Sequence, residues 1–203
     1  MEQTASPSPT EHGTRALSTR SLQALADALP ALYAETSLTG LPRAFADTLA
    51  KLIPGESHGV VVHDFGRKKR FWHLRPAALE HESLVPIFFA NFHEFASADY
   101  RRMTGSGTAL ALSDFKSRAG INRLAIYNEY YRRLGIEDDL SISVQRGEVV
   151  TCAAVLRRRR GFRPEERELM NALRPHFKQA WANADCFAQL SAARSAATSP
   201  ACA

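Results

Sequence analysis

Cysteine is scarce in this sequence, and long apolar runs are absent from it. The 203 residues include three cysteines, Cys152, Cys186 and Cys202, at wide spacing. An odd number of distant cysteines does not fit a disulfide framework or a CxxC zinc site, so we expect reduced thiols that act as small apolar side chains. No run of about eighteen apolar residues occurs, which excludes a membrane-spanning helix. The polar N-terminal stretch MEQTASPSPTEHGTR lacks the features of a secretory signal, so we expect a cytoplasmic protein.

The remaining composition is typical of one folded domain. Hydrophobic residues make up 45% of the chain, and the formal net charge is +5. This length allows one sizeable core, which we place at residues 17–190, between a disordered tail at 1–16 and a flexible tail at 191–203. The positive charge permits an acidic partner, but by itself it is weak evidence for nucleic-acid binding.

Strand signals occur in three places. Residues 58–65 and 70–74 are rich in β-branched and aromatic side chains and flank the polar turn GRKK, which predicts a hairpin. Residues 139–145 alternate apolar and polar side chains, and residues 149–156 are almost all apolar or small, which predicts a second hairpin. We expect a short strand within residues 105–115.

Helix signals precede, separate and follow these strands. Apolar residues at three- and four-residue spacing predict helices within 18–53, interrupted at Pro30 and at 40–42. The same spacing predicts helices at 83–103, 117–135 and 164–188. The last helix begins at Pro164 with glutamates in its first turn, and Pro175 should kink it. This order predicts an α+β fold of GAF or PAS type, in which helices flank an antiparallel sheet and a long kinked helix ends the domain.

Four consecutive arginines, Arg157 to Arg160, follow the last predicted strand. In a nucleic-acid-binding protein such a run contacts phosphates. Here the run has no interleaved aromatic residues and no reading helix, and Glu165, Glu166 and Glu168 follow closely. We therefore interpret the run as a solvated turn at the edge of the sheet, where charge also discourages pairing with other sheets.

Aromatic residues supply the candidates for a ligand site. In a GAF-like domain the ligand lies between the sheet and the helices that cross it, and such sites are mostly apolar with a few polar groups. The candidate ligand-binding residues are Trp72, Phe89, Phe92, His93, Tyr127 and Tyr131. The tyrosines are the stronger candidates, because a hydroxyl group at a pocket edge can both pack and hydrogen-bond. Aromatic residues at helical spacing also form plain core, and the sequence leaves that alternative open.

The histidines and Asp114 are the remaining candidates for chemistry. Five histidines lie between His58 and His93, and the first predicted hairpin can bring His63 near His73. Their spacing matches no metal-binding signature, so we expect structural or surface roles, with no metal and no cofactor. Asp114 is expected to cap the helix that follows it rather than to act as a base. No residue is expected to be catalytic.

Three ordered blocks of the sequence carry a family resemblance. They are LALSDF at 110–115, LAIYNEYYRRLGIEDDLSISV at 124–144 and GFRPEERELMNALRPHFKQAWANA at 161–184. Together they resemble a GAF-like branch of the N-terminal sensor regions of LuxR-class bacterial regulators, over about residues 52–190. The resemblance implies a domain that binds an unknown small molecule. It also implies a homodimer, or a heterodimer with a related regulator, and we expect Phe177 and Trp181 to be the anchors of that interface.

The sequence departs from that family in two respects. In these regulators the sensor is followed by a DNA-reading domain that begins with an LTxRExEVL-like motif. This sequence lacks that motif. We therefore expect no direct DNA binding by this chain alone. It would be a sensor without its reader, or a reader-less partner that forms inactive mixed dimers with a full-length relative. In addition, Arg163 stands where the family often has a Ser or Thr N-cap, so Pro164 and the glutamates must compensate.

One enzymatic alternative is open. Some GAF-type domains reduce free methionine sulfoxide through clustered cysteines, and Cys152 or Cys186 would supply the thiol here. Cys152 lies in an apolar predicted strand, an environment that raises the pKa of a thiol and lowers its reactivity. The sequence therefore favours a binding domain over an enzyme.

Overall fold

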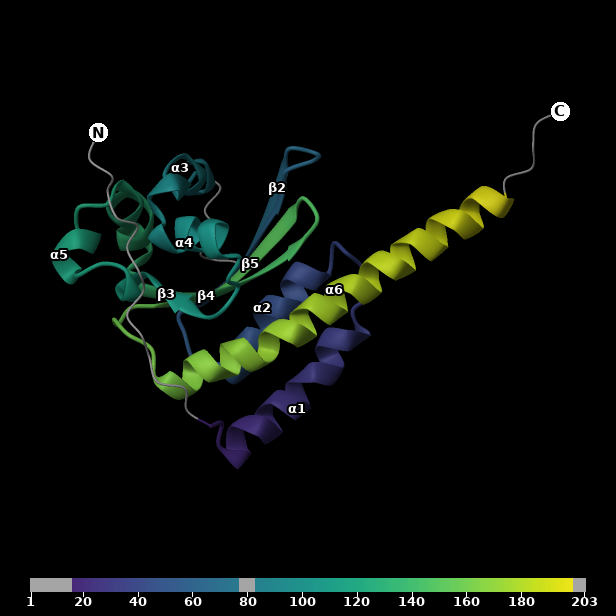
Figure 1. Ribbon diagram of the computed structural model, residues 1–203, viewed down its shortest axis with the longest axis horizontal. Helices are drawn as coiled ribbons and strands as arrows, with labels where there is room; N and C mark the ends of the chain where they lie inside the picture. The colour runs from purple at the N-terminus through teal and green to yellow at the C-terminus, as the bar shows by residue number, and fades with distance from the viewer. Residues whose placement is uncertain (1–15, 77–82, 199–203) are drawn as a thin grey trace.

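The protein folds around a five-stranded antiparallel sheet (Figure 1). A computed structural model describes residues 16–76 and 83–198. The strands are β1 (Ser57–Asp64), β2 (Lys69–Arg75), β3 (Leu110–Ala111), β4 (Asp138–Arg146) and β5 (Val149–Arg157), in the spatial order β2-β1-β5-β4-β3. The antiparallel pairing confirms both predicted hairpins, and β3 is the short strand expected between them.

Long helices cover one face of the sheet (Figure 1). They are α1 (Thr19–Ala34), α2 (Leu41–Leu52) and α6 (Pro164–Thr198). Apolar residues of these helices and of the strands form the main core: Leu32, Leu41, Phe45, Leu49, Val60, Leu140, Ile142, Val155, Met170, Leu173 and Phe177 are each at most 1% exposed. The apolar stripes of the helices therefore close this face tightly.

Short helical segments cover the opposite face. They are α3 (Val85–Ala90), the 3₁₀ turn η2 (Phe92–Glu94), α4 (Ala96–Thr104), the 3₁₀ turn η3 (Leu112–Asp114), α5 (Arg118–Ile121), the π-helical turn η4 (Tyr127–Tyr131) and the 3₁₀ turn η5 (Arg132–Leu134). A second apolar cluster, which includes Phe95, Ile126, Tyr127, Tyr130 and Tyr131, lies between these segments and β5. The α+β fold with helices on both sides of an antiparallel sheet is the predicted one.

Two predicted helices are broken into shorter pieces. The segment 83–103 divides into α3, η2 and α4, and the side chain of Asn91 donates to the Ile87 carbonyl where α3 ends. The segment 117–135 divides after Ile121, and the next helical stretch is capped from outside, because the Glu94 carboxylate accepts from the Ile126 amide at 2.7 Å. This cap comes from a residue 32 positions away, so local periodicity does not reveal it.

The prolines interrupt the long helices less than the sequence suggests. Pro30 lies inside α1, which continues to Ala34, so the predicted break at Pro30 is wrong. Helix α2 begins at Leu41, beside Pro42, as the break at 40–42 predicted. Pro175 lies inside α6, which runs unbroken to Thr198, past the predicted domain end at residue 190. The kink at Pro175 and the flexibility of residues 191–203 stay predictions. Within the described ranges, no helix is long and apolar enough to cross a bilayer.

Arg157 differs from the other arginines of its run. Arg158, Arg159 and Arg160 are exposed, as expected of a solvated turn. Arg157 is 2% exposed, and its guanidinium donates to both carboxylate oxygens of Glu166, at 2.7 and 3.0 Å. Its Nε also donates to the carbonyl of Pro54 at 2.9 Å. The interpretation of the run as solvated is therefore wrong for Arg157, which joins the end of β5 to the start of α6.

The same glutamate compensates for the missing hydroxyl cap of α6. The backbone amide of Arg163 donates to Glu166 Oε2 at 2.8 Å, and the Glu166 amide donates to the Arg163 carbonyl at 3.0 Å. This is the glutamate half of a capping box. The expected compensation by the first-turn glutamates is thus present, and it comes from Glu166.

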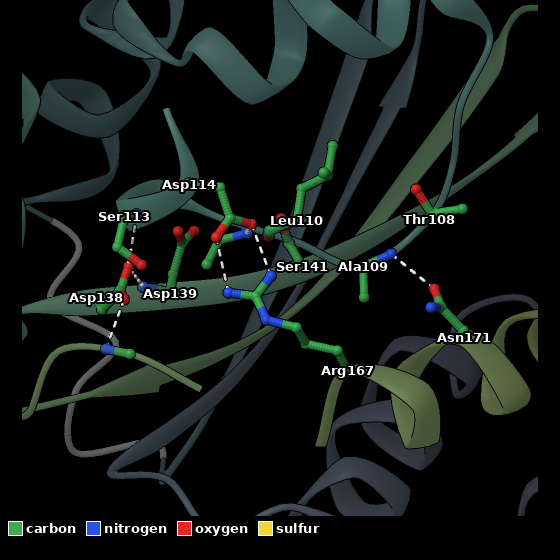
Figure 2. Close-up of polar contacts among 12 residues, drawn as sticks. Thr108, Ala109, Leu110, Ser113, Asp114, Asp138, Asp139, Ser141, Arg167 and Asn171 are labelled. Atoms are coloured by element: carbon green, nitrogen blue, oxygen red, sulfur yellow. Dashed lines mark hydrogen bonds and ion pairs between the residues drawn. The ribbon is translucent and has the colours of Figure 1, made fainter. Parts of the chain in front are cut away.

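Asp114, at the end of η3, links the segment that follows β3 to α6 (Figure 2). Arg167 of α6 donates from both terminal nitrogens to the Asp114 carboxylate, at 2.6 and 2.7 Å, and both side chains are buried. Asp114 also accepts from the Ala111 amide at 2.8 Å. The side chain that caps α5 is Ser117, not Asp114. The predicted capping role is therefore wrong in its target, and Asp114 is instead half of a buried ion pair.

Candidate ligand-binding site

A cavity of about 730 Å³ lies between the sheet and the short helical segments. Its lining comes from β1, β2, β4 and β5, from α3, η2, α4 and η4, and from one side of α6. This volume is within the usual range of small-molecule sites, which are mostly apolar with a few placed polar groups. The two ends of the cavity differ in chemistry.

Aromatic rings form the end over β1 and β2. Phe88 contacts Phe89 and Phe92 edge-on, with ring centroids 5.3 and 5.7 Å apart, and Trp72 of β2 lies 6.2 Å from Phe89. His63 of β1 is 7% exposed and lies against Phe89 and Phe92. Burial, with a contribution from the nearby Arg70, lowers the pKa of His63. The imidazole is therefore neutral at physiological pH and adds an uncharged ring to this end.

A buried acid, Asp139, lies at the other end. The Tyr131 hydroxyl donates to Asp139 at 3.0 Å. Burial, helped by the neighbouring Asp138 charge, raises the pKa of Asp139 to about 7, although the Tyr131 hydrogen bond and the Arg101 charge oppose this shift. Asp139 therefore gains or loses its proton near neutral pH and is able to donate or accept a hydrogen bond.

Arg101 of α4 lies at the same end. Its guanidinium donates to the hydroxyl of Ser141 at 3.2 Å, to the Ser141 carbonyl, and to the Thr108 carbonyl at 3.1 Å. Burial lowers the pKa of Arg101, but an arginine starts so far above neutrality that the group stays cationic. Its Nε is buried without a hydrogen-bond partner among the described residues.

Helix α6 brings two more cations to this end. β3 is two residues long, so it leaves the edge of β4 beyond Ser141 without a strand partner. The Ser143 amide at this edge donates to the Gly107 carbonyl at 3.1 Å, and the Ser143 carbonyl is accessible to α6. There Arg174 donates from Nε to the Ser143 carbonyl at 2.9 Å. A Cβ at Gly107 would lie 2.4 Å from the Arg174 guanidinium, so the approach of Arg174 requires glycine at that position. Lys178 follows one turn later and also lines the cavity.

Most of the predicted ligand-binding residues line this cavity. Trp72, Phe89, Phe92, His93 and Tyr131 do so. Tyr127 does not, because it is buried in the second apolar cluster. The geometry thus brings five of the six candidates together, and ligand binding by them stays a prediction.

Sequence reasoning missed the polar groups of the cavity. Arg101, Asp139, Ser141, Ser143, Arg174 and Lys178 line it and were not among the candidates. Residues 139–145 alternate apolar and polar side chains, a pattern typical of a strand with one wetter face, yet Ser141 and Ser143 on the polar side are both buried. Arg174 resembles any other charged residue of an amphipathic helix, and only the short β3 gives it access to the cavity. The one available signal was the acid pair at 138 and 139 at the start of a predicted strand.

The predicted histidine pair does not form a metal site. In the hairpin register His63 lies opposite Arg70, and His73 lies opposite Val60. His58 instead contacts the Ile53 carbonyl at 2.8 Å. Within residues 16–76 and 83–198, no group of three or more His, Cys, Asp or Glu side chains is placed to hold a metal ion. His81 lies outside the described residues.

The cysteines do not form a cluster in the described part of the chain. Cys152 lines the cavity from β5, and Cys186 is exposed on α6. Burial raises the pKa of the Cys152 thiol, which leaves less of the reactive thiolate at neutral pH. Cys202 lies outside the described residues. This arrangement gives no support to the thiol reductase alternative.

The expected dimer anchors lie at different depths in α6. Phe177 is 1% exposed and packs on Phe45 in the main core, so it is not available to a partner. Trp181 is partly buried beside Phe177. Further along α6, Phe187 is 51% and Leu190 57% exposed, on the part of the helix that extends beyond the sheet (Figure 1). The exposed apolar residues of α6 thus lie further along the helix than predicted.

Solved structures share this fold. The chain is similar to the ligand-binding domain of VqsR from Pseudomonas aeruginosa, with a TM-score of 0.56 and 16% identity over 84% of this chain and 99% of that one. It is similar to CepR2 from Burkholderia cenocepacia, an N-acylhomoserine lactone dependent LuxR family transcription factor, with a TM-score of 0.53 and 13% identity over 80% and 93% of the two chains. The GAF domain of a phosphoenolpyruvate-protein phosphotransferase from Coxiella burnetii gives a TM-score of 0.51 and 12% identity over 83% and 96%.

These likenesses concern the fold. No family model and no curated protein matches the sequence. The fold is that of LuxR-type ligand-binding domains and of GAF domains, as the sequence resemblance implied. Because GAF-like folds serve more than one activity, function has to be argued from the cavity itself.

Proposed function

We propose that this chain is the ligand-sensing and dimerisation domain of a LuxR-type transcriptional regulator, acting in the cytoplasm. The observation that carries the proposal is the cavity, which combines aromatic rings with buried polar groups and lies between the sheet and the crossing segments. A plain core fills such space with side chains, because protein interiors are close-packed. The likeness in fold to regulator ligand-binding domains supports the same proposal.

Ligand binding at this site has a route to the rest of the regulator. The segment between α4 and α5 reaches the cavity through Gly107, which lines it, and through Thr108, whose carbonyl accepts from Arg101 of α4. The same segment touches α6 through two contacts (Figure 2). These are the Asp114–Arg167 ion pair and a 2.8 Å hydrogen bond from the Ala109 amide to the Asn171 side chain. A ligand that shifts this segment shifts α6, the helix that would carry the dimer surface. This is the physical basis of sensing in the proposal.

The proposed partner is a second copy of the chain or a related full-length regulator. The exposed Phe187 and Leu190 on the extending part of α6 support an interface there. A mixed dimer with a relative would form through the same surface of α6. Coexpression with a relative tests this form: if no mixed dimer is recovered, the mixed form is contradicted.

Thermal unfolding with a metabolite panel tests the sensor proposal. A ligand that binds the folded chain raises the unfolding midpoint with the logarithm of its concentration. The matched variants are Ala154→Phe, which places a ring in the cavity from β5, and Ala31→Phe, which adds the same ring on the exposed side of α1. We expect Ala154→Phe to abolish the ligand-induced shift and Ala31→Phe to preserve it. A shift that survives in Ala154→Phe would place binding outside the cavity and refute the proposal.

A further inference from the structure

The cavity has an apolar end and a cationic end, separated across the sheet. The aromatic end lies over β2 and β1, and the polar end lies at β4 and its open edge. Three strand intervals at about 4.8 Å each separate β2 from β4, which gives roughly 14 Å between the two ends. A ligand that contacts both ends must be elongated and must differ in polarity along its length.

The charges at the polar end are unbalanced. Arg101, Arg174 and Lys178 line it, and Asp139 is the one acidic side chain among the described residues of the lining. The excess is two positive charges when Asp139 is ionised and three when it is protonated. Asp139 holds its proton up to about neutral pH, so it offsets the cations only in part. The polar end is therefore electropositive at physiological pH.

The two arginines are held there by backbone carbonyls rather than by carboxylates. Arg101 donates to the carbonyls of Thr108 and Ser141, and Arg174 donates to the carbonyl of Ser143. The charge of Arg174 is close enough to lower the pKa of Arg101, so the two guanidinium groups repel each other. Carbonyl groups orient a cation without neutralising it. An anion at this end would satisfy both guanidinium groups and remove their repulsion.

We propose that the cavity binds an elongated amphipathic organic anion, with its carboxylate at Arg101, Arg174 and Lys178 and its apolar part between the rings of Phe88, Phe89, Phe92 and Trp72. This proposal rests on the proposed sensor function and names the chemical class of its ligand. Size agrees with it, because a chain of about eight to twelve carbons, at about 1.3 Å per bond, extends roughly 9 to 14 Å and fits within the length between the two ends.

Calorimetric titration with three eight-carbon probes tests the charge requirement. The probes are octanoate, octan-1-ol and octylammonium, which share the apolar part and differ in the charge of the head, and acetate supplies the head alone. We expect octanoate to bind at least about tenfold more tightly than octan-1-ol, and octylammonium and acetate to give no measurable heat. The octanoate affinity, unlike that of octan-1-ol, should fall as salt is raised from about 50 to about 500 mM.

Matched charge variants locate the binding site of the head. Arg174→Gln with Lys178→Gln removes two cations of the cavity, and Arg43→Gln with Lys51→Gln removes two exposed cations of α2. We expect the first pair to weaken octanoate binding at least about tenfold and to leave octan-1-ol unchanged, and the second pair to change neither. If the Arg174 variant does not fold, Lys178→Gln alone, at an exposed position, should weaken octanoate binding about threefold and leave octan-1-ol binding unchanged.

The outcomes separate this inference from the sensor function. If octan-1-ol or octylammonium binds in the cavity as tightly as octanoate or more tightly, the proposal of an anionic ligand is wrong, and the proposed sensor function is not affected. Octanoate binding that the Arg174 and Lys178 changes do not weaken would overturn the placement of the head. If no probe binds and no panel compound shifts the unfolding midpoint, the sensor function fails together with the inference.

Discussion

The two faces of the sheet use different kinds of helix and reach different packing. The face under α1, α2 and α6 is closed by long regular helices whose apolar residues are almost fully buried. The opposite face is covered by short α, 3₁₀ and π segments, and it holds the cavity. A long helix presents a continuous apolar stripe to the sheet, whereas short segments in changing directions do not. The difference shows how one sheet supports a stable core on one side and a ligand space on the other.

The largest expected effect is a difference in the loss of stability between a variant of the main core and a variant of the cavity wall. Phe177→Ala removes a ring from the main core and should lower the free energy of unfolding by about 3 to 5 kcal/mol. Phe89→Ala removes a ring from the half-buried wall of the cavity and should cost about 1 kcal/mol or less, while it weakens ligand binding. Urea unfolding of the two variants measures both effects. Equal losses of stability would mean that the two faces of the sheet are packed equally tightly, which would contradict the proposed difference between them.

The next effect tests the link between the faces. The Arg167–Asp114 pair is buried, and removal of one partner leaves the other charge uncompensated. We expect Arg167→Gln to lower the free energy of unfolding by about 3 kcal/mol or more. Asp114→Asn should restore part of the loss in the double variant, because it removes the unpaired charge, and a double-mutant cycle in urea measures the coupling. Additive losses would show that the two side chains act independently.

Sequence patterns predicted the regular parts of this molecule well. The two hairpins, the long last helix from Pro164 and the aromatic wall are set by local periodicity, so residues such as Trp72 and Phe89 were found. The irregular parts depend on distant contacts. The break before Ile126 is capped by Glu94, and the buried state of Arg157 needs Glu166.

The polar end of the cavity is the clearest case of this limit. Arg101, Asp139 and Arg174 come from three elements and meet only because β3 is short and Gly107 lets Arg174 approach. Apart from the acid pair at 138 and 139, none of these residues lies in a pattern that differs from that of a surface helix or a strand end. Strand pairing, which sequence periodicity does not specify beyond a hairpin, decides where they meet.

A smaller effect, a gain in stability instead of a loss, is expected when Asp139 is replaced. Its pKa rises from 3.8 to about 7 on folding, so the folded state retains a proton that the unfolded chain loses. The stability of the wild-type protein should therefore fall as pH rises from about 4 to about 7 and level off above that. Asp139→Asn removes this loss of stability. The difference between the unfolded and folded pKa values limits the loss to about 4 kcal/mol, and we expect the stability of the variant relative to the wild type to rise by about 2 kcal/mol between pH 4 and pH 8.

Urea unfolding at several pH values measures that gain. The groups that face Asp139 are Tyr131, Asp138, Arg101 and Cys152. They are present in both proteins, so the difference between the two curves isolates Asp139. Asp27→Asn, at an exposed position of α1, is the control and should follow the wild type at every pH. A difference that stays constant from pH 4 to pH 8 would show that the folded Asp139 has an ordinary pKa.

The smallest effect distinguishes a binding cavity from a thiol active site. Cys152 lines the cavity but carries a thiol whose burial raises its pKa, and Cys186 is exposed. Replacement of both with serine should cost about 1 kcal/mol of stability, mainly at Cys152. It should change the affinity for octanoate by less than about twofold, since a neutral thiol adds little to an anion site. Calorimetry on the double variant measures this. Methionine sulfoxide reduction that is present in the wild type and lost in the variant would instead make one of the two thiols a reacting group. If Cys152→Ser alone also abolishes it, the cavity face serves chemistry rather than recognition.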